Sequence, residues 1–199
     1  MAKSILIYCG SSKGHNVVYE QEAIKLVRSL KEHDCKIIFG AGSVGLMGVL
    51  ADEYLRIGGE LIGVIPSFME PWEVKHLGIQ TCHFTQSMHE RKEMMAEMAD
   101  AVIALPGGFG TLDELFEMLT WKQLDLHQMP VSILNTANYY RHLLKHMDHM
   151  VQEGFLKDRN LAALHVESDP EKLADWLIAY EPEKMEKKWM PMVCLPCLD

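Results

Sequence analysis

The sequence predicts an α/β protein: a single domain built on a doubly wound, Rossmann-like parallel sheet with helices on both faces. Short runs rich in branched apolar residues alternate along the chain with longer amphipathic stretches of helical periodicity. The short runs are almost continuously apolar, as expected of parallel strands that are covered on both faces. The chain has 199 residues, 48% of them apolar and 24% charged, which is enough for one ordinary core.

The predicted elements follow one another in a βα alternation, which implies right-handed crossovers. Strands are predicted at 4–9 (SILIYC), 36–40 (KIIFG), 60–66 (ELIGVIP), 101–106 (AVIALP) and 130–135 (PVSILN), and TCHF adds a candidate short strand at 81–84. Helical patterns lie between them, at 17–33, 45–58, 88–99, 112–126 and 138–153, followed by 170–180. We expect residues 1–180 to form the domain and 181–199 to be a C-terminal tail that packs on it or on a partner.

Charge and hydropathy narrow the class of protein. The formal net charge of -9 argues against a nucleic-acid surface, because phosphate backbones require stripes of Lys and Arg. One small anion can still bind in a local pocket, since backbone amides supply positive potential there. No apolar run approaches the roughly 20 residues of a membrane span, and the start of the sequence lacks the pattern of a signal peptide. We therefore expect a cytoplasmic protein with no nucleic-acid or membrane partner.

The metal-ligating residue types show no spacing typical of a site. The cysteines are odd in number and scattered, which predicts reduced thiols: Cys9, Cys35, Cys82, Cys194 and Cys197. Cys194 and Cys197 form a Cys-x-x-Cys in a Pro-flanked tail, without a helix to lower a thiol pKa or a second ligand pair. The histidines at 76, 83 and 89 have no ligand spacing either. The sequence predicts no metal and no cofactor.

The loops that follow the predicted strands are candidates for a ligand site, because ligands of such sheets bind outside the carboxyl ends of the strands. Three of these loops are rich in Gly and Ser: CGSSKG, GAGSVGLMG and PGGFGT. Such loops let the backbone approach a ligand closely and present its amides. Ser11 in the first loop, and Gly42 and Ser43 in the second, are candidate substrate contacts.

GAGSVG, Gly40 to Gly45, matches the Gly-x-Gly-x-x-Gly pattern of dinucleotide sites. That interpretation requires an acidic residue at the end of the next strand, whereas Glu60 stands at its start. The pattern also follows the second strand instead of the first. The sequence therefore favours a single phosphate or a nucleotide monophosphate. Alternatively, the glycines serve only tight strand-to-helix packing.

PGGFGTLDE, Pro106 to Glu114, has both a structural and a functional interpretation. Thr111 and Glu114 have the spacing of a capping box, with Thr111 as N-cap and Glu114 as the third helical residue. Four apolar residues at helical spacing would then form the buried face: Leu112, Leu115, Phe116 and Leu119. A cap does not require three preceding glycines, which instead create a concavity of amides at a helix N-terminus, where an anion is favoured. We therefore favour a phosphate site beside an acidic residue.

MHERKEMMAEM, Met88 to Met98, places Arg91 on a stripe of methionines. A guanidinium at the edge of a buried stripe requires an acidic or phosphate partner. Alternatively, Arg91 lays its stem over methionine and reaches water. Lys92, taken alone, is typical of a solvated surface residue.

Taken in order, CGSS, GSVGLMG, GGELIGVIP, MHERK, PGGFGTLDE, TWKQL and NYY resemble the LONELY GUY (LOG) family over residues 4 to 160. The resemblance implies hydrolysis of the N-glycosidic bond of AMP or N6-prenyl-AMP, in the cytokinin-activating manner, to free base and ribose 5-phosphate. Relatives often carry the older label lysine decarboxylase, which fits these residues poorly because nothing indicates a Schiff-base lysine with its supporting site.

The resemblance also implies roles for single residues. Arg91 and Glu114 correspond to the catalytic pair, and Glu73 corresponds to an acidic residue near the ribose or base. The other implied nucleotide contacts are Lys92, Gly107, Gly108, Phe109, Gly110, Thr111, Leu112, Asp113 and Thr120. The family is dimeric or larger, and the helix that carries Arg91 belongs to its usual interface. Departures from the family pattern concern substrate preference more than chemistry: Ala41, Ser87, Asp113 and the missing Gly before the tyrosines of NYY.

The expected mechanism follows from the oxocarbenium-like ribose through which nucleoside cleavage passes. A carboxylate at Glu114 would stabilise the developing positive charge and orient or deprotonate the attacking water. Arg91 would assist the departing base or hold Glu114 in place, and the sequence leaves both roles open. The alternative function is a non-enzymatic carrier of a nucleotide or of the molybdenum cofactor, since such carriers have similar Gly-rich loops.

Overall fold

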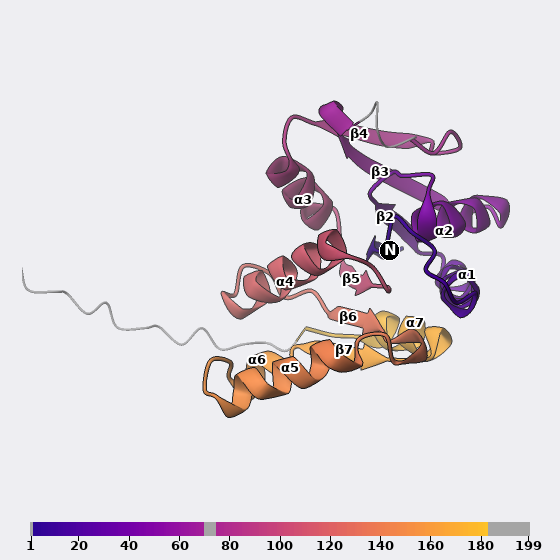
Figure 1. The fold of residues 1–199 in the computed structure, drawn as a ribbon. Helices are drawn as coiled ribbons and strands as arrows, with labels where there is room; N and C mark the ends of the chain where they lie inside the picture. Colours follow the sequence, from indigo (N-terminus) through magenta and orange to yellow (C-terminus); the bar gives the residue numbers. More distant parts are fainter. Residues whose placement is uncertain (1, 70–74, 183–199) are drawn as a thin grey trace, which may run out of the picture.

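The computed structural model describes residues 2–69 and 75–182 (Figure 1). Within them, seven parallel strands form one sheet in the order β4-β3-β2-β1-β5-β6-β7. The strands are β1 (Ser4–Tyr8), β2 (Lys36–Phe39), β3 (Glu60–Pro66), β4 (Thr81–Thr85), β5 (Ala101–Ala104), β6 (Val131–Leu134) and β7 (Leu164–Glu167). The order reverses at β1, which pairs with both β2 and β5. In such a sheet this switch point is where a ligand crevice opens.

The helices cover both faces of the sheet, so the predicted α/β class is confirmed. They are α1 (Val18–Glu32), α2 (Gly45–Arg56), α3 (Met88–Glu97), α4 (Phe109–Gln123), α5 (Arg141–Gln152), α6 (Asp158–Leu161) and α7 (Pro170–Ala179), with short 3-10 turns η1 (Ser67–Met69) and η2 (Thr136–Asn138). Residues of α1, α2 and α7 share one buried cluster with one face of the strands. Residues of α3, α4 and α5 share a second cluster with the other face.

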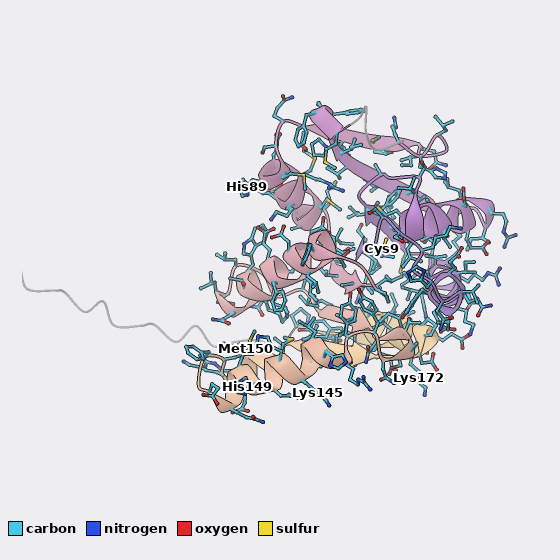
Figure 2. All side chains as sticks on the ribbon, in the orientation of Figure 1. Cys9, His89, Lys145, His149, Met150 and Lys172 are labelled. Carbon is cyan, nitrogen blue, oxygen red and sulfur yellow. The ribbon has the colours of Figure 1, made fainter. Side chains whose placement is uncertain are left out.

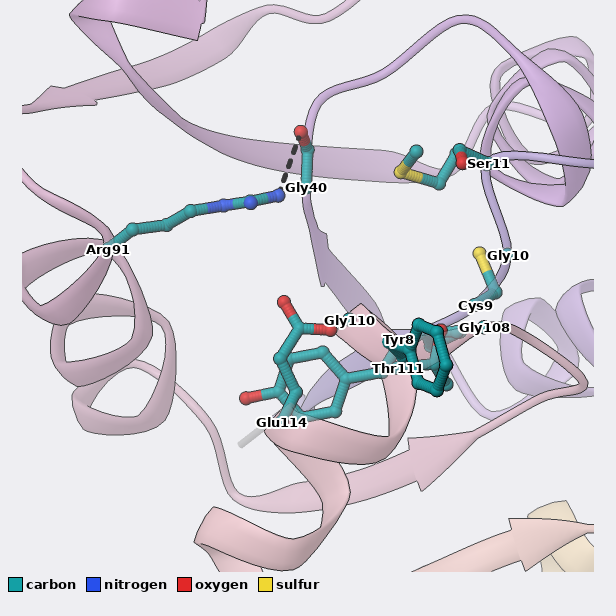
Figure 3. A pocket seen from close by; sticks show the side chains of 13 residues that line it. Tyr8, Cys9, Gly10, Ser11, Gly40, Arg91, Gly108, Gly110, Thr111 and Glu114 are labelled. Atoms are coloured by element: carbon teal, nitrogen blue, oxygen red, sulfur yellow. Dashed lines mark hydrogen bonds between the residues drawn. The ribbon is translucent and has the colours of Figure 1, made fainter.

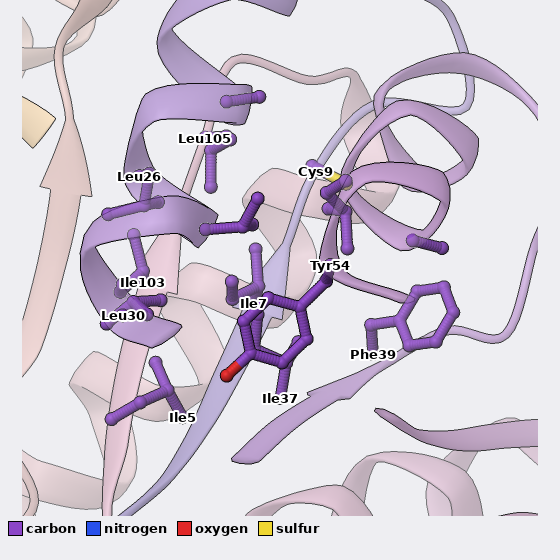
Figure 4. Packing of buried hydrophobic residues seen from close by; sticks show 14 of the residues in the cluster. Ile5, Ile7, Cys9, Leu26, Leu30, Ile37, Phe39, Tyr54, Ile103 and Leu105 are labelled. Carbon is purple, nitrogen blue, oxygen red and sulfur yellow. The ribbon is translucent and has the colours of Figure 1, made fainter. Parts of the chain in front are cut away.

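The alternation of side chains along β1 shows how one strand supplies both cores. Ile5 and Ile7 belong to the cluster under α1 and α2, whereas Leu6 and Tyr8 belong to the cluster under α3 and α4. All four are buried, which explains the continuously apolar strand sequence. Tyr54 lies among the apolar side chains of the first cluster (Figure 4), and its buried hydroxyl donates to the Cys35 carbonyl. At the periphery, Lys145 and His149 of α5 project away from the sheet (Figure 2).

Two elements at the end of the chain were not predicted: strand β7 and the short helix α6. β7 is an edge strand with the sequence LHVE, in which only Leu164 is buried and Val166 is 40% exposed. Its half-polar alternation differs from the continuous apolar runs of the inner strands. The candidate strand at 81–84 is confirmed as β4. The helix predicted at 138–153 begins later, at Arg141, because Ala137 and Asn138 have left-handed φ values of 50° and 58°.

No helix within the described ranges combines the length and the apolar character needed to cross a membrane.

Candidate active site

A cleft of about 210 Å³ lies at the carboxyl ends of the central strands (Figure 3). Its walls come from the end of β1 and the loop after it, the residue directly after β2, one side chain each of α2 and α3, and the first turns of α4. Arg91 of α3 and Glu114 of α4 both line it, together with Gly108, Gly110 and Thr111. The fold thus brings together the two residues expected to be catalytic and the glycine-rich turn.

Glu114 lies in the second turn of α4, and its carboxylate is directed into the cleft (Figure 3). Its charge acts on the neighbouring end of β1. Burial raises the pKa of Tyr8, and the Glu114 carboxylate raises it further. The same two causes raise the pKa of the Cys9 thiol. Tyr8 therefore stays protonated, so the floor of the cleft offers a neutral hydroxyl beside a carboxylate.

Arg91 is 6% exposed and is fixed by one carbonyl group of β3 and one directly after β2. Its Nε donates to the Val64 carbonyl at 3.1 Å, and its Nη2 donates to the Gly40 carbonyl at 3.3 Å (Figure 3). A Cβ atom on residue 40 would lie 2.2 Å from Nη2, so this glycine makes room for the guanidinium. The alternative that Arg91 reaches bulk water is wrong. The contacts recorded for its guanidinium nitrogens are these two carbonyls and the Met88 sulfur at 4.0 Å.

The predicted capping box at Thr111 is wrong, because α4 begins at Phe109 with Gly108 as its N-cap. Thr111 is the third helical residue and is buried, and Glu114 is the sixth. The glycine-rich turn continues directly into the helix, so no side chain caps its first amides. An uncapped helix N-terminus with its dipole is a ready site for an anion.

The packing around the glycines of this turn differs from one glycine to the next. A Cβ atom at Gly107 would lie 2.1 Å from the Thr111 hydroxyl oxygen, so packing alone requires this glycine. A Cβ atom at Gly108 or Gly110 would meet nothing within 4 Å, and neither residue has a positive φ. Both face the cleft. Neither packing nor a positive φ therefore requires glycine at these two positions, where the missing side chains leave the backbone open to the cleft.

The loops after β1, β2 and β5 are bonded to one another. The Gly10 amide donates to the Pro106 carbonyl at 3.1 Å, and the Leu46 amide donates to the Gly10 carbonyl at 3.0 Å. Gly45 has a φ of 63°, and a Cβ atom there would lie 2.2 Å from the Ser11 carbonyl carbon. This glycine therefore serves tight packing, which was the alternative interpretation of GAGSVG.

The positions of Glu60 and of the loop after β2 bear on the interpretation of GAGSVG. Glu60 lies at the start of β3 and pairs with Lys36 at 2.8 Å. Ala41, which replaces a family glycine, adopts a left-handed φ of 63°. Gly42 and Ser43 do not line the cleft; Gly42 instead forms an isolated bridge with Lys75.

Lys92 lies outside the cleft and is held by two carboxylates of α4. Its Nζ lies 3.1 Å from Asp113 and 3.0 Å from Glu117, and its side chain is 9% exposed. Burial lowers the pKa of Lys92, but the hydrogen bonds and charges of the two carboxylates outweigh it and the pKa is raised. The prediction of a solvated surface lysine is wrong. In this chain the ammonium is therefore engaged by α4.

The other predicted contacts are distributed as follows. Ser11 and Phe109 line the cleft, and Phe109 is 94% exposed. Leu112 packs in the second core cluster, and the Thr120 hydroxyl donates to the Phe116 carbonyl at 2.7 Å on the exposed side of α4. Glu73 lies outside the described residues, as do Cys194 and Cys197.

The cleft residues that were missed from the sequence include Tyr8, Cys9 and Met47. Tyr8 and Cys9 are the last residues of the first predicted strand, directly before Gly10. In a parallel sheet, the last residues of a strand reach the crevice, as do the loops that follow the strand. Their position could therefore have identified Tyr8 and Cys9. Met47, in the first turn of α2, carries no comparable signal.

The fold and the cleft define a Rossmann-like α/β protein with an uncapped, glycine-rich helix N-terminus, a carboxylate and a buried guanidinium at its switch point. The family model described as "Possible lysine decarboxylase" matches residues 47–177. The cytokinin riboside 5'-monophosphate phosphoribohydrolase LOG1 of Arabidopsis thaliana is 38% identical over 191 residues, which cover 94% of this chain and 90% of that protein. A Rhodococcoides fascians enzyme named cytokinin riboside 5'-monophosphate phosphoribohydrolase is 44% identical over 155 residues, 77% of this chain and 78% of that protein. The chain belongs to the LOG family.

Solved structures give the same fold at lower identity. The molybdenum cofactor binding protein of Rippkaea orientalis matches with a TM-score of 0.68 and 18% identity, over 89% of this chain and 96% of that one. The molybdenum cofactor carrier protein of Chlamydomonas reinhardtii matches with a TM-score of 0.67 and 19% identity, over 90% of this chain and 100% of that one. At these identities the likeness concerns the fold alone.

Proposed function

We propose that this protein hydrolyses the N-glycosidic bond of adenosine 5'-monophosphates, including N6-prenylated ones, to free base and ribose 5-phosphate. Two curated LOG relatives are named for the same reaction on cytokinin riboside 5'-monophosphates. The observation that carries the proposal is the shared cleft in which Glu114 and Arg91 face the uncapped N-terminus of α4. A phosphate at that N-terminus and an acid one turn further on are the two requirements of the reaction.

The 5'-phosphate is assigned to the first turn of α4, where Gly108 and Gly110 allow close approach to the amides. Glu114 is five residues beyond Phe109, so its backbone lies about 7.5 Å further along the helix axis. Side chains of a helix lean toward its N-terminus, which returns the carboxylate toward the phosphate end. This span suits a ribose ring whose 5' oxygen carries the phosphate and whose anomeric carbon meets the acid.

In this assignment the bond between C1' and the base nitrogen breaks, and its electron pair leaves with the base. Glu114 stabilises the oxocarbenium-like ribose and accepts a proton from the attacking water, whose oxygen bonds to C1'. The departing base takes up one proton and Glu114 gives its proton back to solvent, so the net change is one water added across the bond. Arg91 is rigidly held by two carbonyls, so its remaining N–H groups are pre-oriented toward the departing base or toward Glu114. Phosphate binding remote from C1' is used to position the sugar.

The second candidate is a carrier of a phosphorylated cofactor, which the shared fold of the molybdenum cofactor carriers favours. Incubating the protein with AMP, N6-isopentenyl-AMP and adenosine, and separating the products by chromatography, distinguishes the two functions. The hydrolase releases free base and ribose 5-phosphate from the nucleotides and much less base from adenosine. Tight nucleotide binding without base release would support the carrier instead.

We further propose that residues 1–180 form one nucleotide-binding domain, that 181–199 are a tail, and that the protein is a cytoplasmic homodimer. The free thiols of Cys9 and Cys35, both buried, agree with a reducing compartment. Partly exposed apolar side chains beside Arg91's helix, Phe84 and Met88, suit a subunit interface. Light scattering during gel filtration tests the dimer: a monomeric mass at micromolar concentration would contradict it.

A further inference from the structure

Two consecutive tyrosines donate to the loop that leads into α4. The Tyr140 hydroxyl donates to the Leu105 carbonyl at 2.5 Å, and the Tyr139 hydroxyl donates to the Gly107 carbonyl at 2.5 Å. Both tyrosines belong to the connection between β6 and α5, which the proposed reaction does not otherwise use. They are the tyrosines of the NYY motif, for which no role has been assigned above.

The remaining carbonyls of the loop are bonded as well. The Pro106 carbonyl accepts from the Gly10 amide at 3.1 Å, and the Gly108 carbonyl accepts from the Leu112 amide at 3.1 Å. Every carbonyl from residue 105 to residue 108 therefore has a donor. Because a trans peptide is planar, with its C=O and N–H on opposite sides, a fixed carbonyl also fixes the direction of the following amide.

Of the peptides in this loop, the Gly107–Gly108 peptide depends most on a hydrogen bond to hold its orientation. Glycine populates many backbone conformations, so a Gly-Gly peptide plane rotates more easily than any other. Gly108 has open space around its Cα and no side chain to hold it. Within the described residues, the bond that the structure records to the Gly107 carbonyl is the one from Tyr139. The Gly108 N–H therefore points away from Tyr139.

Neighbouring rings and a constrained backbone hold the Tyr139 side chain in position for its hydrogen bond to the Gly107 carbonyl. Its ring packs edge-on against Tyr140, with 4.9 Å between ring centroids, and against Tyr19 of α1 at 5.9 Å. Ala137 and Asn138 just before it both have left-handed φ values, a strain that non-glycine residues adopt at a cost. Tyr139 lines a second cleft that Glu114 does not line, and Gly108 lines both clefts.

We propose that Tyr139 is a positioning residue: its hydroxyl orients the Gly107–Gly108 peptide so that the Gly108 amide points at the phosphate bound at α4. The inference rests on the proposed function for the identity of the phosphate ester. Tyr139 does not touch the substrate and acts through the peptide. Loss of the hydroxyl should weaken phosphate binding and leave the chemistry at C1' intact.

The test compares Tyr139→Phe with Tyr19→Phe, a matched control that removes a hydroxyl from the neighbouring ring of the same second cleft. Tyr139→Phe should raise the Kd for inorganic phosphate and the KM for AMP about 3- to 10-fold, the size expected for one hydrogen bond. The kcat for AMP and the kcat/KM for adenosine should stay within twofold of wild type. Tyr19→Phe should match wild type in all four quantities. Equal phosphate Kd and AMP KM in the two variants would overturn the proposal.

A measurement on the wild type keeps the inference testable if Tyr139→Phe does not fold. Saturating phosphate should slow hydrogen exchange of the Gly108 amide, followed by NMR, and unchanged exchange would overturn the proposal. Both phosphate measurements are independent of hydrolysis. If the wild type releases no base from AMP, the proposed function fails, while phosphate affinity still decides the role of Tyr139.

Discussion

Gly110 allows folding stability and nucleotide binding to be separated by a single substitution. It is the second residue of α4, and a Cβ atom there would meet nothing within 4 Å. Alanine is a better helix former than glycine by up to about 1 kcal/mol, so Gly110→Ala should stabilise the fold by about 0.5–1 kcal/mol. For a chain of this size that corresponds to a rise in Tm of about 1–4 °C.

The same methyl group projects into the cleft where the 5'-phosphate is assigned. It should hold the phosphate away from the first amides of α4 and reduce kcat/KM for AMP at least about tenfold, or about 1.4 kcal/mol. Calorimetry gives the Tm, and chromatographic assay of released adenine gives kcat/KM. A variant that gains stability and keeps full activity would refute the placement of the phosphate.

Gly58→Ala is the matched control for Gly110→Ala. A Cβ atom at Gly58 also meets nothing within 4 Å, but this glycine has a left-handed φ of 75° and lies at the end of α2. Alanine in that conformation should cost about 1 kcal/mol of stability. Activity at saturating AMP, measured well below the Tm, should be unchanged. Gly110→Ala is thus expected to raise stability and lower activity, whereas Gly58→Ala should lower stability and leave activity unchanged.

Two further substitutions test how the scaffold is held. Tyr140→Phe leaves the buried Leu105 carbonyl without its hydroxyl donor, so unfolding by urea should show a loss of about 1–3 kcal/mol. Glu53, whose pKa is lowered to about 2 by hydrogen bonds from Arg56 and Arg28, stabilises the fold above about pH 4.5 and loses that contribution as the pH falls toward 2. Glu53→Gln should therefore lower the free energy of unfolding by about 1–2 kcal/mol at pH 7, a range that allows for the half-exposed arginines. Near pH 2 the substitution should cost almost nothing. An equal cost at both pH values would contradict the ion pairs.

The inner part of the fold was predictable because burial on both faces leaves a simple signature. Ile5, Leu6 and Ile7 all face a core, so their run reads as a strand whatever its register. The edge strand β7 has one buried residue and three that are at least partly exposed, so its sequence resembles a loop. Helix ends were harder: α4 begins at Phe109, three residues before the predicted start at 112, because the helix includes Gly110 and Thr111.

Parts of the candidate site were predictable where the chemistry of a side chain determines which partners it needs. Arg91 on a methionine stripe had to find polar partners, but the carbonyls of Val64 in β3 and of Gly40 after β2 lie far away in sequence. Lys92 looked solvated because its partners, Asp113 and Glu117, are on a different helix. Such long-range pairs follow from the packing of α3 on the sheet and beside α4, which single-sequence patterns do not specify.

Replacing Glu114 with glutamine tests the central claim most directly, because Glu114→Gln keeps the shape of the side chain and removes its charge. The account predicts that the variant binds AMP within about threefold of the wild-type Kd, since the phosphate site is untouched. It also predicts that single-turnover release of adenine falls by about 10³-fold or more, equivalent to roughly 4 kcal/mol of transition-state stabilisation. A variant that binds AMP and cleaves it within tenfold of the wild-type rate would contradict the role of Glu114 in bond cleavage.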